Sequence, residues 1–201
     1  QKETQYPLAM LLSIASVVAG PTPHPECRLT TPSGTLHGLY DPTRSLCSYR
    51  GIPYAKPPVS DRRWRSPVPA GTWEGVWNAT AFGDICLQTP RYSWSTVENR
   101  DRSSEDCLYL NIVAPLANST SSPRALPVVV YFHAGEFSYG ASCDAESDWP
   151  WSNDIVLVTP NSRLGIFGYL GAADLRGRAD NGATGSYGIE DQREALRWVA
   201  A

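Results

Sequence analysis

The sequence predicts an α/β domain, in which helices cover a central β-sheet. Two apolar runs, residues 127–132 (PVVVYF) and 155–160 (IVLVTP), lack the alternation of a strand with one face in water. Near-continuous apolar strands are typical of a sheet that is covered on both faces. A third observation is the helical pattern at residues 190–198, which supplies a candidate for a covering helix.

The composition fits one folded domain and argues against a nucleic-acid partner. Of the 201 residues, 42% are hydrophobic and 18% are charged, which is enough apolar material to bury a substantial core. The net charge is −3 and the 17 Lys and Arg residues are scattered, so the sequence lacks the basic patch of a nucleic-acid binder. Zinc-ligand spacing is also missing, and we expect neither a metal nor a cofactor.

The first 20 residues predict a secretory signal peptide. Lys2 precedes a largely apolar run over residues 7–19, and small residues at 17–19 offer a cleavage site. A buried or membrane helix is the alternative, but a run of about 13 residues is shorter than the roughly 20 that span a bilayer. We therefore expect a secreted or extracellular protein, with a membrane anchor elsewhere left open.

Two further features agree with export through the endoplasmic reticulum. Asn78 and Asn118 begin the glycosylation sequons Asn-Ala-Thr and Asn-Ser-Thr. Five cysteines are more than a cytosolic domain of this size usually carries, so we expect disulfides among residues 27, 47, 86, 107 and 143.

The first predicted elements are a hairpin and a long ordered coil. Residues 30–40 place short β-branched and apolar stretches on either side of Ser33-Gly34, which predicts a β-hairpin. Cys27 and Cys47 flank this hairpin and could be joined by a disulfide. Residues 51–77 contain five prolines and three tryptophans, so we expect an extended, irregular chain that is pinned by aromatic packing.

Three strands and a helix complete the prediction. Residues 107–114, 127–132 and 155–160 are short apolar runs suited to strands. In the predicted helix, one stripe of apolar residues is the candidate packing face, while the charged residues lie mostly elsewhere. The stripe contains Ile189, Ala195, Leu196 and Val199, and the charged residues are Asp191, Arg193, Glu194 and Arg197.

Seven stretches, in matching order and approximate spacing, carry a resemblance to one protein family. They are GIPYAKPP (51–58), RRWRSP (62–67), WEGVWNAT (73–80), SEDCLYLNI (104–112), YFHAGEFSYG (131–140), NSRLGIFGYL (161–170) and GSYGIEDQREALRW (185–198). On these residues the chain resembles the N-terminal part of type-B carboxylesterases, which are α/β-hydrolases that include cholinesterases and the non-catalytic neuroligins. The resemblance implies an α/β-hydrolase fold that begins with antiparallel strands and continues as a mixed central sheet flanked by helices.

The ends of the sequence indicate a part of such a domain. The chain begins without methionine and stops inside the helical pattern at residues 196–201. We interpret residues 21–201 as the truncated N-terminal portion of a type-B carboxylesterase domain, with the fold incomplete.

The resemblance also implies a disulfide and two structural ion pairs. Cys86 and Cys107 correspond to a family disulfide that closes a loop forming one wall of the active-site gorge. The spacing of Trp94 in this loop differs from that of the family's substrate-facing tryptophan, so we do not transfer that role. The ion pairs, both expected to be buried, join Arg63 to Glu105 and Arg163 to Asp191.

The family's oxyanion hole corresponds to the stretch that begins at His133. There an HGGGF-like motif supplies two consecutive backbone amides, which bind the oxygen that becomes negative when an ester carbonyl is attacked. The resemblance assigns these donors to Gly135 and Glu136. Ala134 is a mild change unless its φ is positive, whereas the carboxylate of Glu136 repels the developing negative charge unless it is paired or points away. His133 is expected to orient the loop and not to act as the catalytic base.

The sequence contains no nucleophile elbow, and the serine, acid and histidine of the triad would all follow residue 201. Ser138 and Ser186 are interpreted as turn residues. The first hypothesis is a carboxylic ester hydrolase that acts on a small-molecule ester through a serine acyl-enzyme, with these residues supplying the oxyanion loop and gorge wall. The alternatives are a secreted or cell-surface interaction protein of the neuroligin kind, with a protein partner, and a fragment without function.

Overall fold

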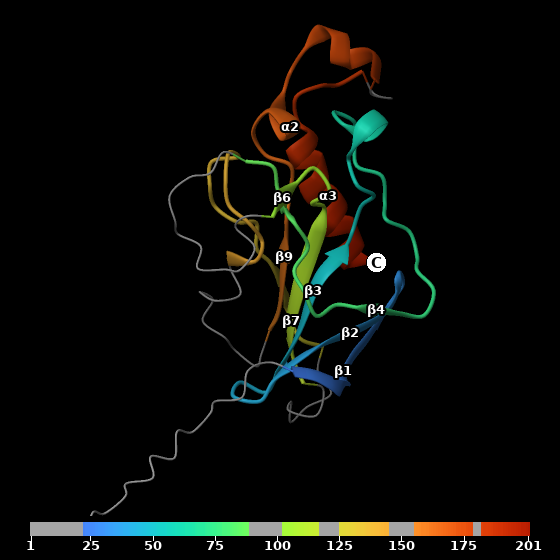
Figure 1. The fold of residues 1–201 in the computed structure, drawn as a ribbon, viewed down its shortest axis with the longest axis vertical. Coiled ribbons are helices and arrows are strands. Elements are labelled where there is room, and N and C mark those ends of the chain that lie inside the picture. The colour runs from blue at the N-terminus through green and yellow to red at the C-terminus, as the bar shows by residue number, and fades with distance from the viewer. Residues whose placement is uncertain (1–21, 89–101, 117–124, 145–154, 179–181) are drawn as a thin grey trace, which may run out of the picture.

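The computed structural model describes residues 22–88, 102–116, 125–144, 155–178 and 182–201. In these residues seven strands form one mixed sheet in the order β1-β2-β3-β7-β9-β8, with β4 paired to β2 (Figure 1). The strands are β1 Thr22–Thr31, β2 Gly34–Asp41, β3 Leu46–Pro53, β4 Val76–Asn78, β7 Tyr109–Pro115, β8 Val128–Val130 and β9 Val156–Pro160. The prediction of an α/β domain with an antiparallel start is confirmed.

The predicted hairpin is formed by β1 and β2, which pair antiparallel with Thr31 opposite Gly34. A side chain at Gly34 would overlap the indole of Trp73, and this indole donates a hydrogen bond to Thr35 O at 3.1 Å. A disulfide joins Cys27 to Cys47, with 5.5 Å between their Cα atoms. The hairpin is therefore closed at its turn by aromatic packing and across its strands by a covalent link.

The coil at residues 51–77 is pinned by tryptophans, as predicted. The Trp77 indole donates to Gly51 O at 3.2 Å, and the Trp64 indole donates to Ile166 O at 3.0 Å. A short 3-10 helix, Ser60–Arg62, interrupts the coil. These long-range hydrogen bonds add to backbone bonds such as Tyr54 N to Leu108 O and Lys56 N to Val68 O, and together they hold the irregular segment in place.

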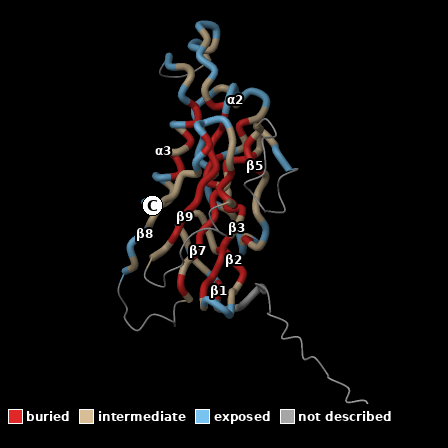
Figure 2. The backbone as a smooth tube through the Cα atoms, turned by 90° about the vertical axis from the view of Figure 1, so that its left-hand side faces the viewer, coloured by how far each residue is buried: buried red, intermediate tan, exposed pale blue. Residues whose placement is uncertain are grey.

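The middle of the sheet is its most buried part. β7 lies between β3 and β9, antiparallel to both, and four of the five residues of β9 are buried. Leu110, Ile112 and Val158 from these strands join one apolar core, which also receives Ala195 from the C-terminal helix. Figure 2 shows this burial as a continuous band along β2, β3 and β7.

One strand is less covered than predicted. β8 pairs with β9 in parallel and stands at the end of the strand order, so it is an edge strand in the part of the chain that the structure describes. Val128 is 50% exposed. The continuous apolar run at residues 127–132 suggested a strand buried on both faces, and that expectation is wrong for β8 in this chain, whereas it holds for β9.

Two helices follow β9. The short helix α2, Gly165–Tyr169, contacts the longer helix α3, Tyr187–Ala200, and a 3-10 helix, Ala173–Arg178, lies between them in sequence. Within the described residues, no helix is long and apolar enough to cross a membrane.

The buried face of α3 matches the predicted stripe only in part: Ala195 is fully buried and Val199 packs partly against the core. Ile189 and Leu196 are exposed, whereas Asp191 and Glu194 are buried together with Ala195. Asp191 points inward to Arg163, and the buried residues of the helix are Tyr187, Gly188, Asp191, Glu194 and Ala195. Periodicity located the helix and two of the four residues expected to pack, whereas the burial of Asp191 accompanies its ion pair with Arg163.

Candidate active site

The candidate site is the loop at residues 133–140, which follows β8. Tyr131 still donates a sheet hydrogen bond to Val158 O at 2.8 Å, and the chain then turns sharply. Three consecutive residues have positive φ angles, Gly135 at 128°, Glu136 at 54° and Phe137 at 60°. The amides of Ser138 and Tyr139 both donate to Gly135 O, at 2.9 and 3.1 Å, which closes the turn.

Glycine is required at position 135. A Cβ built there would overlap the carbonyl oxygen of Tyr139, and the φ of 128° is one that L side chains rarely adopt. Ala134 does not have a positive φ, so its methyl group is the mild change that the sequence suggested. Glu136 does adopt the left-handed region, at a cost of about 1–2 kcal/mol for a residue with a side chain.

The two amides expected to bind an oxyanion are free. Among the described residues, neither Gly135 N–H nor Glu136 N–H donates a hydrogen bond. Buried or partly buried amides are normally paired, so two consecutive free donors in a tight turn are suited to an acceptor from outside. The carboxylate of Glu136 is exposed and forms no ion pair with a described residue.

The loop is fastened at two points. At Phe137, Gly165 N–H donates to the carbonyl oxygen at 2.8 Å, and the Phe137 ring packs on Tyr169 with 5.0 Å between centroids. At Gly140, the Gln88 side chain forms two hydrogen bonds, together called the Gln88 clasp. Its Nε2 donates to Gly140 O at 2.9 Å and its Oε1 accepts from Gly140 N at 2.8 Å. The sequence analysis missed Gln88, whose only signal is its place two residues after Cys86.

His133 makes its contact inside the same loop. Its Nδ1–H donates to Ala134 O at 2.9 Å, and a side chain at Gly140 would lie 2.5 Å from the ring. Burial lowers the pKa of His133 below its usual value, so the ring is neutral at pH 7. A loop-orienting role for His133 stays a prediction that this geometry supports.

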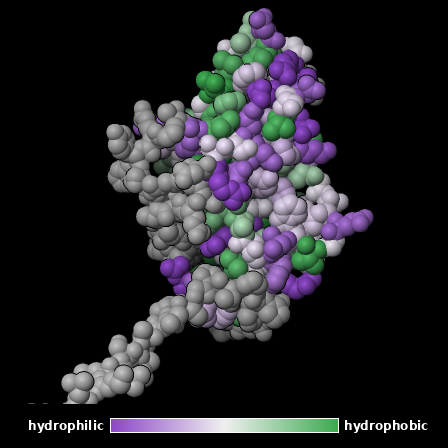
Figure 3. Space-filling view, viewed as in Figure 1, coloured by the Kyte–Doolittle hydropathy of each residue, from purple (hydrophilic) through white to green (hydrophobic). Residues whose placement is uncertain are grey.

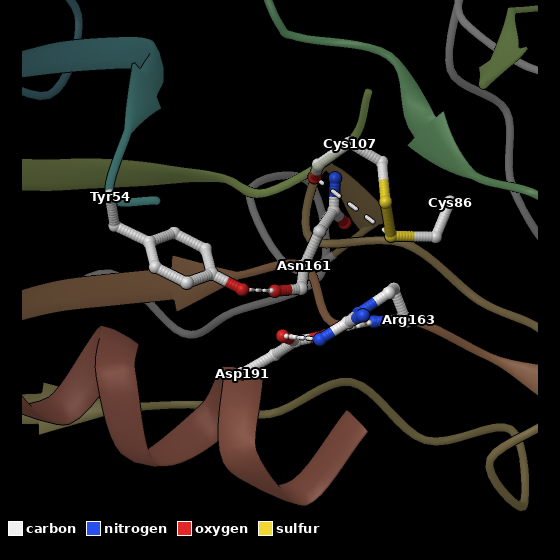
Figure 4. Close-up of polar contacts among 6 residues, drawn as sticks. All are labelled: Tyr54, Cys86, Cys107, Asn161, Arg163 and Asp191. Carbon is white, nitrogen blue, oxygen red and sulfur yellow. Dashed lines mark hydrogen bonds and ion pairs between the residues drawn. A yellow bond between two sulfur atoms is a disulfide. The ribbon is translucent and has the colours of Figure 1, made fainter. Parts of the chain in front are cut away.

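The disulfide Cys86–Cys107 stands beside the Gln88 clasp. It joins β5, Ile85–Cys86, to the residues just before β7, with 4.9 Å between Cα atoms (Figure 4). β5 pairs in parallel with β6, Ser103–Ser104, so the base of the intervening loop is also closed by hydrogen bonds. The middle of that loop, including Trp94, lies outside the described residues.

Arg163 and Asp191 form the buried ion pair that the resemblance implied. The guanidinium donates from Nε and Nη2 at 2.8 and 2.7 Å, and the backbone amide of Arg163 adds a third bond at 3.0 Å (Figure 4). Burial raises the pKa of the Asp191 carboxyl, an effect that Arg163 opposes. Burial and the nearby Asp191 charge likewise hold the pKa of Tyr54 well above its usual value; its hydroxyl donates to Asn161 O at 2.6 Å.

Arg63 and Glu105 also meet, through Nε and Nη2 of the guanidinium and both carboxylate oxygens. Their side chains are 37% and 18% exposed, so the expectation that this pair is buried is not met. A pocket next to this pair is lined by Arg63, Glu105, Arg163, Phe167 and both cysteines of the Cys86–Cys107 disulfide, among others, and by no residue of the 133–140 loop.

A buried amide network supports the segment after the loop. Asn111 on β7 accepts from Gly51 N at 3.0 Å and donates to the hydroxyls of Ser142 and Thr159, at 3.0 and 3.3 Å. Asn161 accepts from Ser142 N at 2.8 Å. Asn111 inside β7 and Asn161 just after β9 thus hold the segment that follows the loop, a role that the sequence analysis did not assign.

The remaining predicted residues are placed as follows. Asn78 ends β4 and is exposed, whereas Asn118 and the predicted signal peptide at residues 1–20 lie outside the described residues. Ser138 lies in the turn, where its hydroxyl donates to Glu136 O at 3.2 Å, and Ser186 precedes α3 without a side-chain cap. In the described ranges, no group of three His, Cys, Asp or Glu residues could hold a metal ion.

Comparison with known proteins gives one consistent family. The family model described as "Carboxylesterase family" matches residues 25–201. Venom carboxylesterase-6 of Apis mellifera is 35% identical over 175 residues, which is 86% of this chain and 30% of that protein. Para-nitrobenzyl esterase of Bacillus subtilis is 36% identical and covers 85% of this chain and 34% of its own. The chain therefore spans about a third of the length of these relatives.

Solved structures agree. A PNB esterase structure matches with a TM-score of 0.71 and 36% identity, over 86% of this chain and 34% of that one. Carboxylesterase EST55 of Geobacillus stearothermophilus matches with a TM-score of 0.67 and 33% identity, over 86% and 33% of the two chains.

Proposed function

We propose, because the chain belongs to the carboxylesterase family, that it is the oxyanion-binding part of a carboxylic ester hydrolase with the α/β-hydrolase fold. The observation that carries the proposal is the pair of consecutive free amides at Gly135 and Glu136 in a left-handed turn after β8. Such donors bind the oxygen of a tetrahedral intermediate, and removing one donor from an oxyanion hole costs about a hundred- to a thousandfold in rate.

The chemistry divides between the loop and residues outside this chain. A serine nucleophile with its histidine and acid would attack the ester carbonyl and form an acyl-enzyme, which water then hydrolyses. The 201 residues contain no nucleophile elbow, so the triad would be supplied by sequence beyond them. The loop's own task is to hold two amides in place while negative charge develops on the substrate oxygen.

The fastenings of the loop support this task. An oxyanion hole works because its dipoles are fixed before the reaction, so they need no reorganisation when charge appears. Gly165 and Tyr169 hold the loop at Phe137, and Gln88 holds it at Gly140. The substrate is proposed to be a small-molecule ester, in keeping with the esterase names of the relatives.

A non-catalytic interaction protein is the second candidate, and Glu136 is the observation that favours it. A carboxylate beside the donors opposes the anion that they would bind. Exposed apolar side chains also surround the loop's anchor on α2, where Ile166 is 64% exposed, and Figure 3 shows hydrophobic residues among hydrophilic ones at this end of the molecule. Such a surface suits a protein partner as well as it suits the remainder of an esterase fold.

The deciding experiment is hydrolysis of a p-nitrophenyl ester by the complete protein and its Glu136→Gly variant. The expected result is measurable turnover that increases in the glycine variant, because the repulsive charge and the left-handed strain are both removed. A matched control is Glu74→Gln, which neutralises an exposed acid outside the loop. Absence of turnover in both the wild type and Glu136→Gly would leave the interaction protein as the better account.

We also propose that the protein is secreted and glycosylated at Asn78 and Asn118. The predicted signal peptide, two disulfides and the exposed position of Asn78 support this proposal. Expression in eukaryotic cells should give secreted protein whose mass falls after treatment with peptide N-glycosidase F. The Asn78→Gln and Asn118→Gln variants should each lose one glycan, and retention of unglycosylated protein in the cytosol would contradict the proposal.

A further inference from the structure

We propose that Glu136 makes the site select esters by charge, favouring a positively charged acyl group and disfavouring a negatively charged one. The inference rests on the proposed function and deepens it by naming a class of substrate. The observation behind it is that Glu136 supplies both an oxyanion donor and a carboxylate that forms no ion pair with a described residue.

The covalent structure of Glu136 fixes the distance between these two groups. Standard bond lengths keep the carboxylate oxygens within about 6 Å of the amide nitrogen of the same residue, whichever rotamer the side chain adopts. A substrate whose carbonyl oxygen accepts from this amide therefore has its carbonyl carbon within about 10 Å of a negative charge. The glycines expected at this position from the resemblance carry no such charge.

Nothing in the described part of the chain cancels this charge. The ion pairs there join Arg44 to Asp41, Arg63 to Glu105, Arg102 to Asp84, Arg163 to Asp191 and Arg197 to Glu194, and none includes Glu136. The side chain of Glu136 is exposed to solvent.

The other titratable groups at the loop add no positive charge. Burial lowers the pKa of His133, so this ring is neutral at pH 7. Asp144, just beyond the loop, is also an acid, and its carboxylate accepts a hydrogen bond from Ala141 N at 3.1 Å. The field that an approaching acyl group meets from the described residues of the loop is therefore negative.

Coulomb's law sets the size of the effect. Two unit charges about 7 Å apart change a rate by about three- to fiftyfold, for effective dielectric constants between about 80 and 20. The charge of Glu136 should accelerate hydrolysis of a cationic ester and slow that of an anionic one. The ratio of the two rates therefore responds more strongly to this charge than either rate alone. Salt should reduce it, because the carboxylate is exposed and the Debye length at 1 M is only about 3 Å.

The test uses the complete protein and three p-nitrophenyl esters of equal acyl length that end in a methyl, a trimethylammonium or a carboxylate group. The value of kcat/KM is measured at low and high salt, after subtraction of spontaneous hydrolysis. We expect the cationic ester to exceed the anionic one by at least about tenfold at low salt. Glu136→Gln, which keeps the size of the side chain, should bring the ratio to within about twofold of one.

Glu74→Gln is the matched control, because it removes an exposed acid outside the loop and should leave the ratio as in the wild type. An equal ratio in the wild type and Glu136→Gln would overturn charge selection while leaving ester hydrolysis intact. No hydrolysis of any ester by any variant would overturn the proposed function, and the inference with it.

Discussion

Arg163 and Asp191 are joined by three hydrogen bonds of 2.7–3.0 Å although their side chains are only 3% and 0% exposed. The pair connects the segment after β9 to α3. Arg63 and Glu105 make a similar two-oxygen contact nearer the solvent, at 37% and 18% exposure. Breaking the ion pair should therefore cost more free energy of unfolding at the buried position than at the more exposed one.

Breaking the buried pair should strongly destabilise the fold. Arg163→Gln leaves Asp191 buried without its charge partner, and removal of one member of a buried pair typically costs about 3–5 kcal/mol. Urea unfolding followed by circular dichroism measures this loss. The matched control is Arg102→Gln, because the side chains of the Arg102–Asp84 pair are 58% and 30% exposed and such solvent-exposed pairs contribute about 0–1 kcal/mol. Equal losses in the two variants would contradict the structural role assigned to Arg163.

The two disulfides should contribute comparable stability. They close loops with sequence separations of 20 and 21, and loop-closure entropy for such lengths is about 3 kcal/mol, less any strain. Replacing Cys27 and Cys47 together by serine, or Cys86 and Cys107 together, should each lower the free energy of unfolding by about this amount. Peptide mapping without reduction provides the control, because it must recover both linked pairs from the wild type.

Strand positions were predictable from the sequence because they depend on local patterns. The hairpin at β1 and β2 follows from Ser33-Gly34 between apolar stretches, and β7 and β9 follow from their apolar runs. Coverage was less predictable, since Val128 belongs to an apolar run and is nevertheless half exposed at the sheet edge. Segments far away in the sequence decide what packs against a strand, and the periodicity of the strand itself carries no information about them.

The supports of the candidate site were the least predictable part. The Gln88 clasp on Gly140 joins residues 52 positions apart, and the Asn111 and Asn161 network joins three separate segments. Single polar residues within or beside apolar strands give no pattern that identifies their partners. On α3 the hydrophobic stripe placed Ala195 and Val199 correctly but not Ile189 and Leu196, and the burial of Asp191 against Arg163 was implied by the family resemblance and not by periodicity.

The turn at Gly135 should tolerate no side chain. Gly135→Ala places a methyl group on the Tyr139 carbonyl as well as straining a positive φ, so we expect a loss above about 2 kcal/mol. Gly71→Ala is the matched control: Gly71 also has a positive φ, of 86°, but nothing lies within 4 Å of an added Cβ, so only the strain of about 1 kcal/mol should appear. Similar losses in thermal unfolding would show that the Tyr139 contact is unimportant.

His133 should make stability depend on pH on the acidic side of neutrality. Burial lowers its pKa in the folded protein below the usual 6.5, so between these two values the unfolded chain binds more protons than the folded one. The contribution of neutral His133 to the free energy of unfolding is therefore fully present above about pH 6.5. It is lost as the pH falls, by at most about 1.4 kcal/mol per pH unit. His133→Asn should flatten this slope in urea unfolding measured from pH 7.5 to 5, whereas His37→Asn on β2 should preserve it. A slope unchanged in His133→Asn would show that other groups cause the dependence and that protonation of this ring does not loosen the loop.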